Sequence, residues 1–197
     1  YSYIYDPDKS DWAGRFKIVD GMPVSSSSIN LRWTKKGVLG WAGDGIWMLD
    51  SKILEWKKVA TKGKMAGSGV DSCGMVYDSK RDRMLFVSQN GYGKPFDGQI
   101  TALDVNTFQA DQLNPEGMEV LNPCQMFLRE VAYHPESDIF LWNQLLSKNG
   151  KTAKNMFLAY DAGKNRWVYI KIDGGSGPPF EGIGAVCSGI KYDAKRG

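Results

Sequence analysis

Apolar and polar residues alternate along this chain in short runs that end at turn-forming residues. In residues 73–113, the segments near 73–78, 83–89, 100–105 and 108–113 are continuously apolar or alternate with period two. The residues between them are rich in Asp, Ser, Lys, Asn and Gly, several of which favour tight turns. We therefore predict that these four segments form one four-stranded antiparallel sheet. No segment has a 3.6-residue apolar stripe of helical length, so the pattern predicts an all-β fold.

One stretch with many charges is repeated. VYDSKRDRMLFV, residues 76–87, recurs as AYHPESDIFLWN at 132–143, and its first half recurs as KYDAKRG at 191–197. Tyr77, Tyr133 and Tyr192 are thereby 56 and 59 residues apart. A charged run that recurs between two apolar runs indicates a hairpin turn, and we expect residues 78–83 to form a solvated tip rather than a charged binding site.

A second motif consists of an acidic residue that closes an apolar run and a tryptophan six positions later. It occurs three times, as Asp6–Trp12, Asp50–Trp56 and Asp161–Trp167. A weaker copy begins at Asp104 and has Ala110 at the sixth position, with Phe108 nearby. The four acidic residues are 44, 54 and 57 residues apart. The chain is therefore built from internal repeats.

Each period contains about four strands, which is typical of a β-propeller blade. We predict a single propeller domain, residues 1–197, of four-stranded antiparallel blades. Three blades are complete, at about 28–60, 72–114 and 128–171, and two are partial, at about 1–20 and 186–197. We expect Trp56 and Trp167 to be buried in the wedges between neighbouring twisted sheets.

At the Tyr-Asp turn and the Asp–Trp pairs, the chain resembles the kelch-type β-propellers, including those related to the central domain of galactose oxidase. Tyr77, Asp78, Met84–Val87 and the three Asp–Trp pairs carry the resemblance, which extends over most of the chain. The Gly-Gly doublet usual after the second kelch strand is replaced by Val87-Ser88-Gln89 and Trp142-Asn143-Gln144. An irregular β-sandwich and an α/β fold remain as alternatives to the propeller.

The two partial blades have a consequence for assembly. An open arc of blades would expose unpaired strand edges and an apolar face. We therefore expect the chain to belong to a longer propeller or to complete its ring with another chain.

Composition excludes several classes of function. The net charge of +3 comes from 25 basic and 22 acidic residues that are interspersed, so nucleic acid is not an expected partner. Three cysteines without a C-x-x-C pair and a single histidine predict no zinc site, and we expect no metal and no cofactor. The longest apolar runs fall short of 18 residues, so no membrane insertion is expected. Nothing in the sequence indicates a compartment.

Catalytic constellations are not evident in the sequence. The only histidine, His134, lies in a predicted hairpin turn, so a nucleophile–histidine pair could be built only around this turn residue. A copper site like that of galactose oxidase would need more than one histidine. The acidic segment 6–11 has Asp11 where a calcium-binding EF-hand loop needs glycine. We assign no catalytic residue.

The remaining candidate is a ligand-binding face. In a propeller, the loops between the second and third strands and the loops between blades open on the same face as the central channel. The candidate binding residues on this face are Arg32, Trp41, Asp71, Asn90, Tyr92, Arg129, Glu130 and Asn143. Aromatic rings beside amide and guanidinium groups suit a protein or glycan ligand, and the sequence thus favours a non-catalytic binding or scaffold module.

An enzyme is the alternative. Asp71, Glu130, Arg32 and Arg129 could serve acid–base chemistry on a carbohydrate or small polar substrate in a propeller enzyme. Trp41 also has an alternative interpretation, as a packed residue that contacts no ligand.

Overall fold

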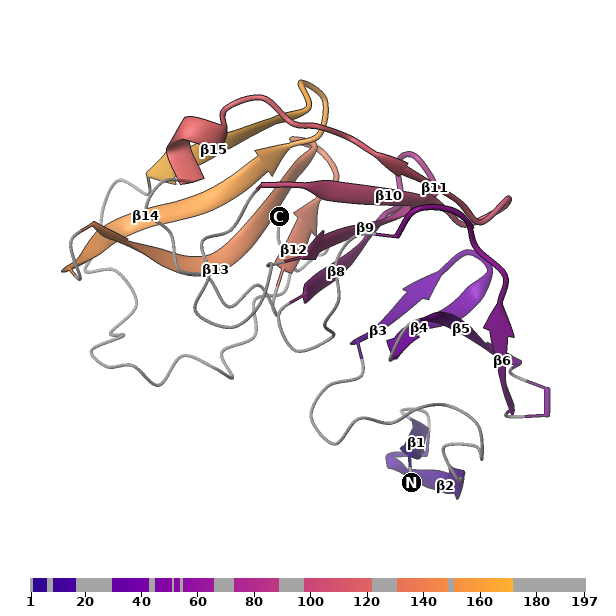
Figure 1. Cartoon of the computed structure of the whole chain (residues 1–197). Coiled ribbons are helices and arrows are strands. Elements are labelled where there is room, and N and C mark those ends of the chain that lie inside the picture. Colours follow the sequence, from indigo (N-terminus) through magenta and orange to yellow (C-terminus); the bar gives the residue numbers. More distant parts are fainter. Residues whose placement is uncertain are drawn as a thin grey trace.

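The computed structural model describes residues 2–6, 9–16, 30–42, 45–50, 52–53, 55–65, 73–88, 98–121, 131–148 and 151–171. In these residues the fold is all-β, with one short 3₁₀ helix at Met118–Leu121 and no α-helix. The strands form a two-stranded sheet and three larger sheets, none of which closes into a barrel (Figure 1).

The sheets follow one another along the chain, and we name them A to D. Sheet A contains β1 (Ser2–Asp6) and β2 (Asp11–Phe16). Sheet B contains β3 (Asn30–Thr34), β4 (Gly37–Ala42), β5 (Gly45–Asp50) and β6 (Glu55–Val59). Sheet C contains β7 (Lys62–Gly63), β8 (Cys73–Asp78), β9 (Arg83–Ser88), β10 (Ile100–Asp104) and β11 (Gln109–Gln112). Sheet D contains β12 (Val131–His134), β13 (Ile139–Lys148), β14 (Lys151–Asp161) and β15 (Arg166–Lys171).

Strands pair with their neighbours in the chain. The predicted four-stranded antiparallel arrangement within residues 73–113 is confirmed, since β8, β9, β10 and β11 pair in this order. The fifth strand, β7, was not predicted, and it pairs parallel with β11. In sheets B and D the spatial order is also the chain order.

Sheets B, C and D pack face to face, with their first strands side by side: β3 contacts β8, and β8 contacts β12. In the run Met84–Val87, all four residues are fully buried, because sheet C is covered on both faces. Met84 and Phe86 pack in the cluster shared with sheet B, and Leu85 and Val87 pack in the cluster shared with sheet D. We call the face of a sheet that is turned toward the following sheet its front face, and the opposite one its back face.

The two predicted wedge tryptophans are both buried. Trp167 lies on the back face of sheet D, in the cluster shared with sheet C, and its indole Nε1 donates to the carbonyl of Gly98 at 2.9 Å. Trp56 is also buried and pairs in register with Leu49 on the back face of sheet B, away from sheet C. A position between two sheets is therefore established for Trp167.

The connections between sheets run along the outer edge of the sheet that follows. The N–H of Lys62 donates to the carbonyl of Phe108 at 2.9 Å. In the next connection, the N–H of Glu116 donates to the backbone carbonyl of Asn165 at 3.0 Å. The next residue is glycine in both connections, with φ of +82° at Gly63 and +76° at Gly117. These conformations favour glycine because it lacks a Cβ atom.

Candidate functional site

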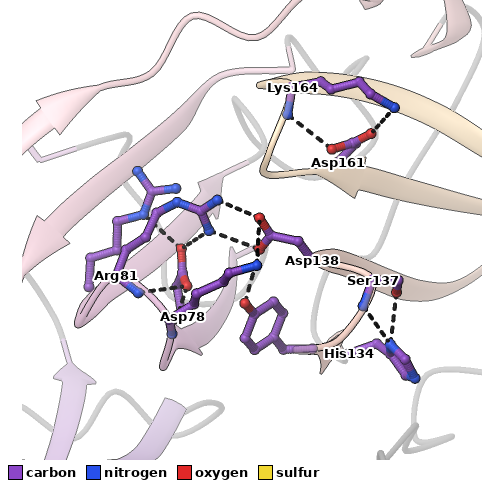
Figure 2. A network of polar contacts seen from close by, with 10 residues as sticks. Asp78, Arg81, His134, Ser137, Asp138, Asp161 and Lys164 are labelled. Carbon is purple, nitrogen blue, oxygen red and sulfur yellow. Dashed lines mark hydrogen bonds and ion pairs between the residues drawn. The ribbon is translucent and has the colours of Figure 1, made fainter.

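The densest group of charged side chains in the described structure lies where the β8–β9 turn meets the β12–β13 turn (Figure 2). Asp78, at the end of β8, is completely buried. One of its carboxylate oxygens lies 3.1 Å from Arg81 Nη1 and 2.9 Å from Arg83 Nε. The other accepts the backbone N–H groups of Lys80 and Arg81, both at 3.2 Å. This buried carboxylate is therefore fully paired.

Arg81 also reaches across to the next sheet. Its Nη1 donates to Asp138 Oδ1 at 2.8 Å, and its Nη2 binds the other oxygen of the same carboxylate. The hydroxyl of Tyr133 donates to Asp138 Oδ1 at 3.0 Å. Asp138 has a left-handed backbone, with φ of 59°, and its carbonyl accepts the N–H of Ala162 at 3.0 Å. Asp138 thus connects the β8–β9, β12–β13 and β14–β15 turns.

The same arrangement occurs one repeat earlier. Asp82 has φ of 52°, accepts the hydroxyl of Tyr77 at 2.7 Å, and accepts the N–H of Val105 through its carbonyl at 3.1 Å. Its second carboxylate oxygen binds the ammonium of Lys35, which lies in the β3–β4 turn. In both cases a cation of one turn binds the aspartate of the following turn. We call Lys35, Tyr77, Asp78, Arg81, Asp82, Tyr133 and Asp138 the turn network.

The pKa values of this network follow from its pairing. The hydrogen bond from Arg81 is the largest cause that lowers the pKa of Asp138 to about 2, and it outweighs the opposing effect of burial. Burial, and then the hydrogen bond to Asp138, raises the pKa of Tyr133 well above its usual value. The hydrogen bond from Lys35 lowers the pKa of Asp82. At neutral pH these carboxylates are ionised and paired, which suits a structural role and not proton transfer.

The structure corrects the prediction of a solvated tip at residues 78–83. A turn is present between β8 and β9, but Asp78 is buried and Arg81 is largely enclosed by its two carboxylate partners. The reason is that the neighbouring turns lie close together, so that the guanidinium of Arg81 reaches an aspartate in the next turn. The sequence contained a signal for this, since Tyr-x-x-x-x-Asp occurs at both Tyr77–Asp82 and Tyr133–Asp138.

The recurring acidic residue of the second motif stabilises the turn between the third and fourth strands. Asp104 Oδ1 accepts the N–H groups of Asn106 at 2.8 Å and Thr107 at 2.7 Å, and Asp161 Oδ1 accepts that of Lys164 at 3.0 Å. The hydrogen bond from the backbone of Thr107 is the largest cause that lowers the pKa of Asp104. Aspartate is therefore repeated at these positions because it satisfies turn N–H groups.

His134 also supports a turn, as predicted. Its Nδ1 accepts the N–H of Ser137 at 3.2 Å and lies 2.8 Å from the Ser137 hydroxyl. Figure 2 shows this contact beside the turn network.

The predicted ligand face is described only in part. Arg32 lies in β3, and its Nη1 donates to the carbonyl of Leu31 at 2.8 Å. Trp41 lies in β4 and not in a loop, and it is buried, with its ring edge to face against Phe86 at a centroid distance of 5.0 Å. Trp41 is therefore a core residue, as its alternative interpretation held. Asn143 was also predicted in a loop and lies in β13. Asp71, Asn90, Tyr92, Arg129 and Glu130 lie outside the described residues, so their grouping stays a prediction.

A shallow groove of about 330 Å³ lies between the connection that follows sheet C and strand β15. Its lining residues are Glu116, Gly117, Glu119, Arg166, Trp167, Val168 and Tyr169, and of these the sequence singled out Trp167 alone, as a buried wedge residue. It places two carboxylates near one guanidinium on the outer edge of sheet D.

Within the described ranges, no group of three or more His, Cys, Asp or Glu residues is placed to hold a metal ion. The same residues contain no helix that is long and apolar enough to cross a membrane. These observations define an all-β protein of consecutive antiparallel sheets joined by ionic contacts between turns. No protein-family model and no curated protein sequence matches the chain.

Proposed function

We propose that sheets B, C and D are successive blades of a kelch-type β-propeller and that the protein is a non-catalytic binding or scaffold module. Three features support this arrangement: four-stranded meanders in chain order, first strands that lie side by side, and sheets packed face to face. In this arrangement, the propeller presents one loop-built face to a ligand.

The turn network is the observation that carries the functional proposal. At the end of the sheets where the β8–β9 and β12–β13 turns lie, the arginine and aspartate side chains bind one another. Groups that are already paired in this way have little capacity left for a ligand. The ligand face is then at the other end, which carries the connection between Ser88 and Ile100 and the starts of the first strands.

The ligand class follows from the residues expected at that end. Asn90 and Tyr92 lie in the connection between Ser88 and Ile100, and Arg32 lies in β3. An aromatic ring beside amide and guanidinium groups suits a protein segment or a glycan.

Binding to an array of defined oligosaccharides and to a displayed peptide library tests the proposal. Tyr92→Ala and Arg32→Ala should each weaken binding of a captured ligand by roughly tenfold or more, as loss of an aromatic or arginine anchor does. Lys80→Gln and Glu136→Gln, which change exposed side chains at the turns, are the controls and should leave binding unchanged.

Two results contradict the proposal. One is a ligand whose binding survives both Tyr92→Ala and Arg32→Ala and is lost in the turn variants. The other is turnover of chromogenic glycosides that disappears in Glu130→Gln, since this would favour the enzyme alternative.

A further inference from the structure

Three charged side chains line the groove on the outer edge of sheet D, which we call the edge groove. Glu116 and Glu119 come from the connection that follows sheet C, Arg166 begins β15, and all three are exposed. Glu116 and Arg166 are partners in a parallel β-bridge. Within the described ranges, the charged groups of these three residues nevertheless form no ion pair and no hydrogen bond. They are therefore available to a ligand, whereas the charges of the turn network bind one another.

The backbone around the edge groove is held in place. The N–H of Glu116 donates to the carbonyl of Asn165 at 3.0 Å, and the N–H of Trp167 donates to the carbonyl of Glu116 at 2.9 Å. Gly117 lies so close to β15 that a Cβ atom on it would be 2.5 Å from the carbonyl oxygen of Trp167. The indole of Trp167 is fixed by its hydrogen bond to Gly98. A groove built in this way exists before a ligand arrives, so binding costs little ordering of the protein.

The equivalent edge of sheet C has the same backbone arrangement and different side chains. Lys62 occupies the place of Glu116 in the connection that pairs with β11. Gln112 Nε2 donates to the carbonyl of Lys64 at 3.3 Å and ties that connection to the strand. In β15, Tyr169 occupies the place of Gln112 and lines the edge groove. Since the connection to sheet C pairs with its strand without carboxylates, the pairing itself does not require them.

We infer that the edge groove binds an extended segment of a partner protein in which basic residues flank an acidic residue. The basic side chains bind Glu116 and Glu119, and the acidic side chain binds Arg166, because a planar guanidinium suits a carboxylate. Two cations and one anion complement the two carboxylates and one guanidinium of the groove. This inference concerns the outer edge of sheet D and does not depend on the proposed ligand face.

The size and shape of the edge groove favour a protein segment over a free small molecule. Its volume of about 330 Å³ is near the lower end of small-molecule pockets, which enclose most of the surface of their ligand. The edge groove is shallow and its charged residues are exposed, so it covers one side of a ligand. An extended segment compensates by placing several side chains along the edge, as in other modes of peptide recognition.

Fluorescence polarisation with labelled, end-capped heptapeptides tests the inference on the whole chain. The four peptides have serine and alanine around a central Lys-Asp-Lys, Lys-Ser-Lys, Ser-Ser-Ser or Glu-Lys-Glu. Lys-Asp-Lys should bind roughly threefold more tightly than Lys-Ser-Lys and roughly tenfold or more above the other two. A surface that only attracts positive charge would favour Lys-Ser-Lys, which has the larger net charge. That order of affinities overturns the inference, as does a Lys-Asp-Lys peptide that does not bind at about 1 mM.

Three variants assign the contacts. Arg166→Gln should abolish the preference for Lys-Asp-Lys over Lys-Ser-Lys, because it removes the partner of the acidic residue. Glu119→Gln should weaken the binding of both peptides by roughly fivefold or more. Glu136→Gln is the matched control, since it removes one negative charge from an exposed residue of the same sheet outside the edge groove.

The control should leave both affinities unchanged, and far-ultraviolet circular dichroism verifies the fold of every variant. An equal loss of affinity in Glu136→Gln and Glu119→Gln overturns the inference, as does a preference for Lys-Asp-Lys that survives Arg166→Gln.

Discussion

The guanidinium of Arg81 binds the carboxylate of Asp138, which lies 57 residues further along the chain and in the next sheet. Exposed ion pairs contribute little to stability, because solvent screens them and the long side chains lose freedom. This pair differs because Arg81 also covers Asp78, which has no solvent exposure. Removing the guanidinium would leave a buried charge with fewer partners, and such losses are large.

We therefore predict that Arg81→Gln lowers the free energy of unfolding by roughly 1–3 kcal/mol, a range reduced for the partial exposure of Arg81. Urea unfolding followed by tryptophan fluorescence measures the change. Lys80→Gln is the matched control, since Lys80 Nζ lies 3.9 Å from Asp138 and is largely exposed. The control should stay within about 0.5 kcal/mol of wild type. Equal losses in the two variants would show that Arg81 has no special role.

The low pKa of Asp138 predicts how stability depends on pH. Its folded pKa of about 2 lies below the usual aspartate value of 3.8, so the charged form is favoured by folding. The contribution is fully present above pH 3.8 and is lost as pH falls through about 2. The difference in unfolding free energy between wild type and Asp138→Asn should thus be roughly 2 kcal/mol near neutral pH and shrink across this window. A difference that is constant over the whole acid range would contradict the ionic explanation.

The two connection glycines should be sensitive to substitution. A Cβ atom at Gly117 would lie 2.5 Å from the carbonyl oxygen of Trp167, and one at Gly63 would lie 2.3 Å from that of Ala110. We expect Gly117→Ala and Gly63→Ala each to cost roughly 2–4 kcal/mol, from steric overlap added to backbone strain.

Gly37→Ala is the control that separates overlap from strain. Gly37 has φ of +112°, but the nearest atom to its added Cβ is 3.9 Å away. Its cost should be confined to strain, roughly 1–2 kcal/mol. Thermal unfolding of the three variants gives the comparison, and a loss at Gly37 as large as that at Gly117 would refute the role of the clash.

Local patterns in the sequence identified strands and turns well. The run Met84–Val87 predicted a strand, and the repeated Asp–Trp spacing predicted the burial of Trp167. Both signals arise from chemistry within a few residues: period-two or continuous apolar runs, and aspartate bonded to turn N–H groups.

Contacts between repeats were harder to predict. The pairing of Arg81 with Asp138 depends on how two turns meet in space. The number of charged residues in a turn does not reveal which of those residues is buried. Trp41 is a candidate for the loop-built ligand face because glycines lie near it at positions 40 and 43, whereas β4 in fact continues to Ala42. A signal for the connections was present, since Gly63 follows Trp56 and Gly117 follows Ala110 by the same seven residues.

The buried pair Trp56 and Trp167 provides the last prediction, because the two residues differ in one hydrogen bond. Trp167 Nε1 donates to the carbonyl of Gly98, whereas Trp56 Nε1 is buried with no acceptor in the described part of the chain. Truncation to alanine should cost roughly 3–5 kcal/mol at either position, since each removes a large buried ring.

Replacement by phenylalanine should separate the two positions. Trp167→Phe loses the bond and leaves the Gly98 carbonyl without this donor, while Trp56→Phe removes a polar atom that has no described partner. We expect Trp167→Phe to be the more destabilising by roughly 1–2 kcal/mol, the net value of a buried hydrogen bond. Guanidinium chloride unfolding of both variants, followed by far-ultraviolet circular dichroism, measures this difference. Equal stability of the two phenylalanine variants would show that the bond to Gly98 contributes nothing to the packing of sheet D on sheet C.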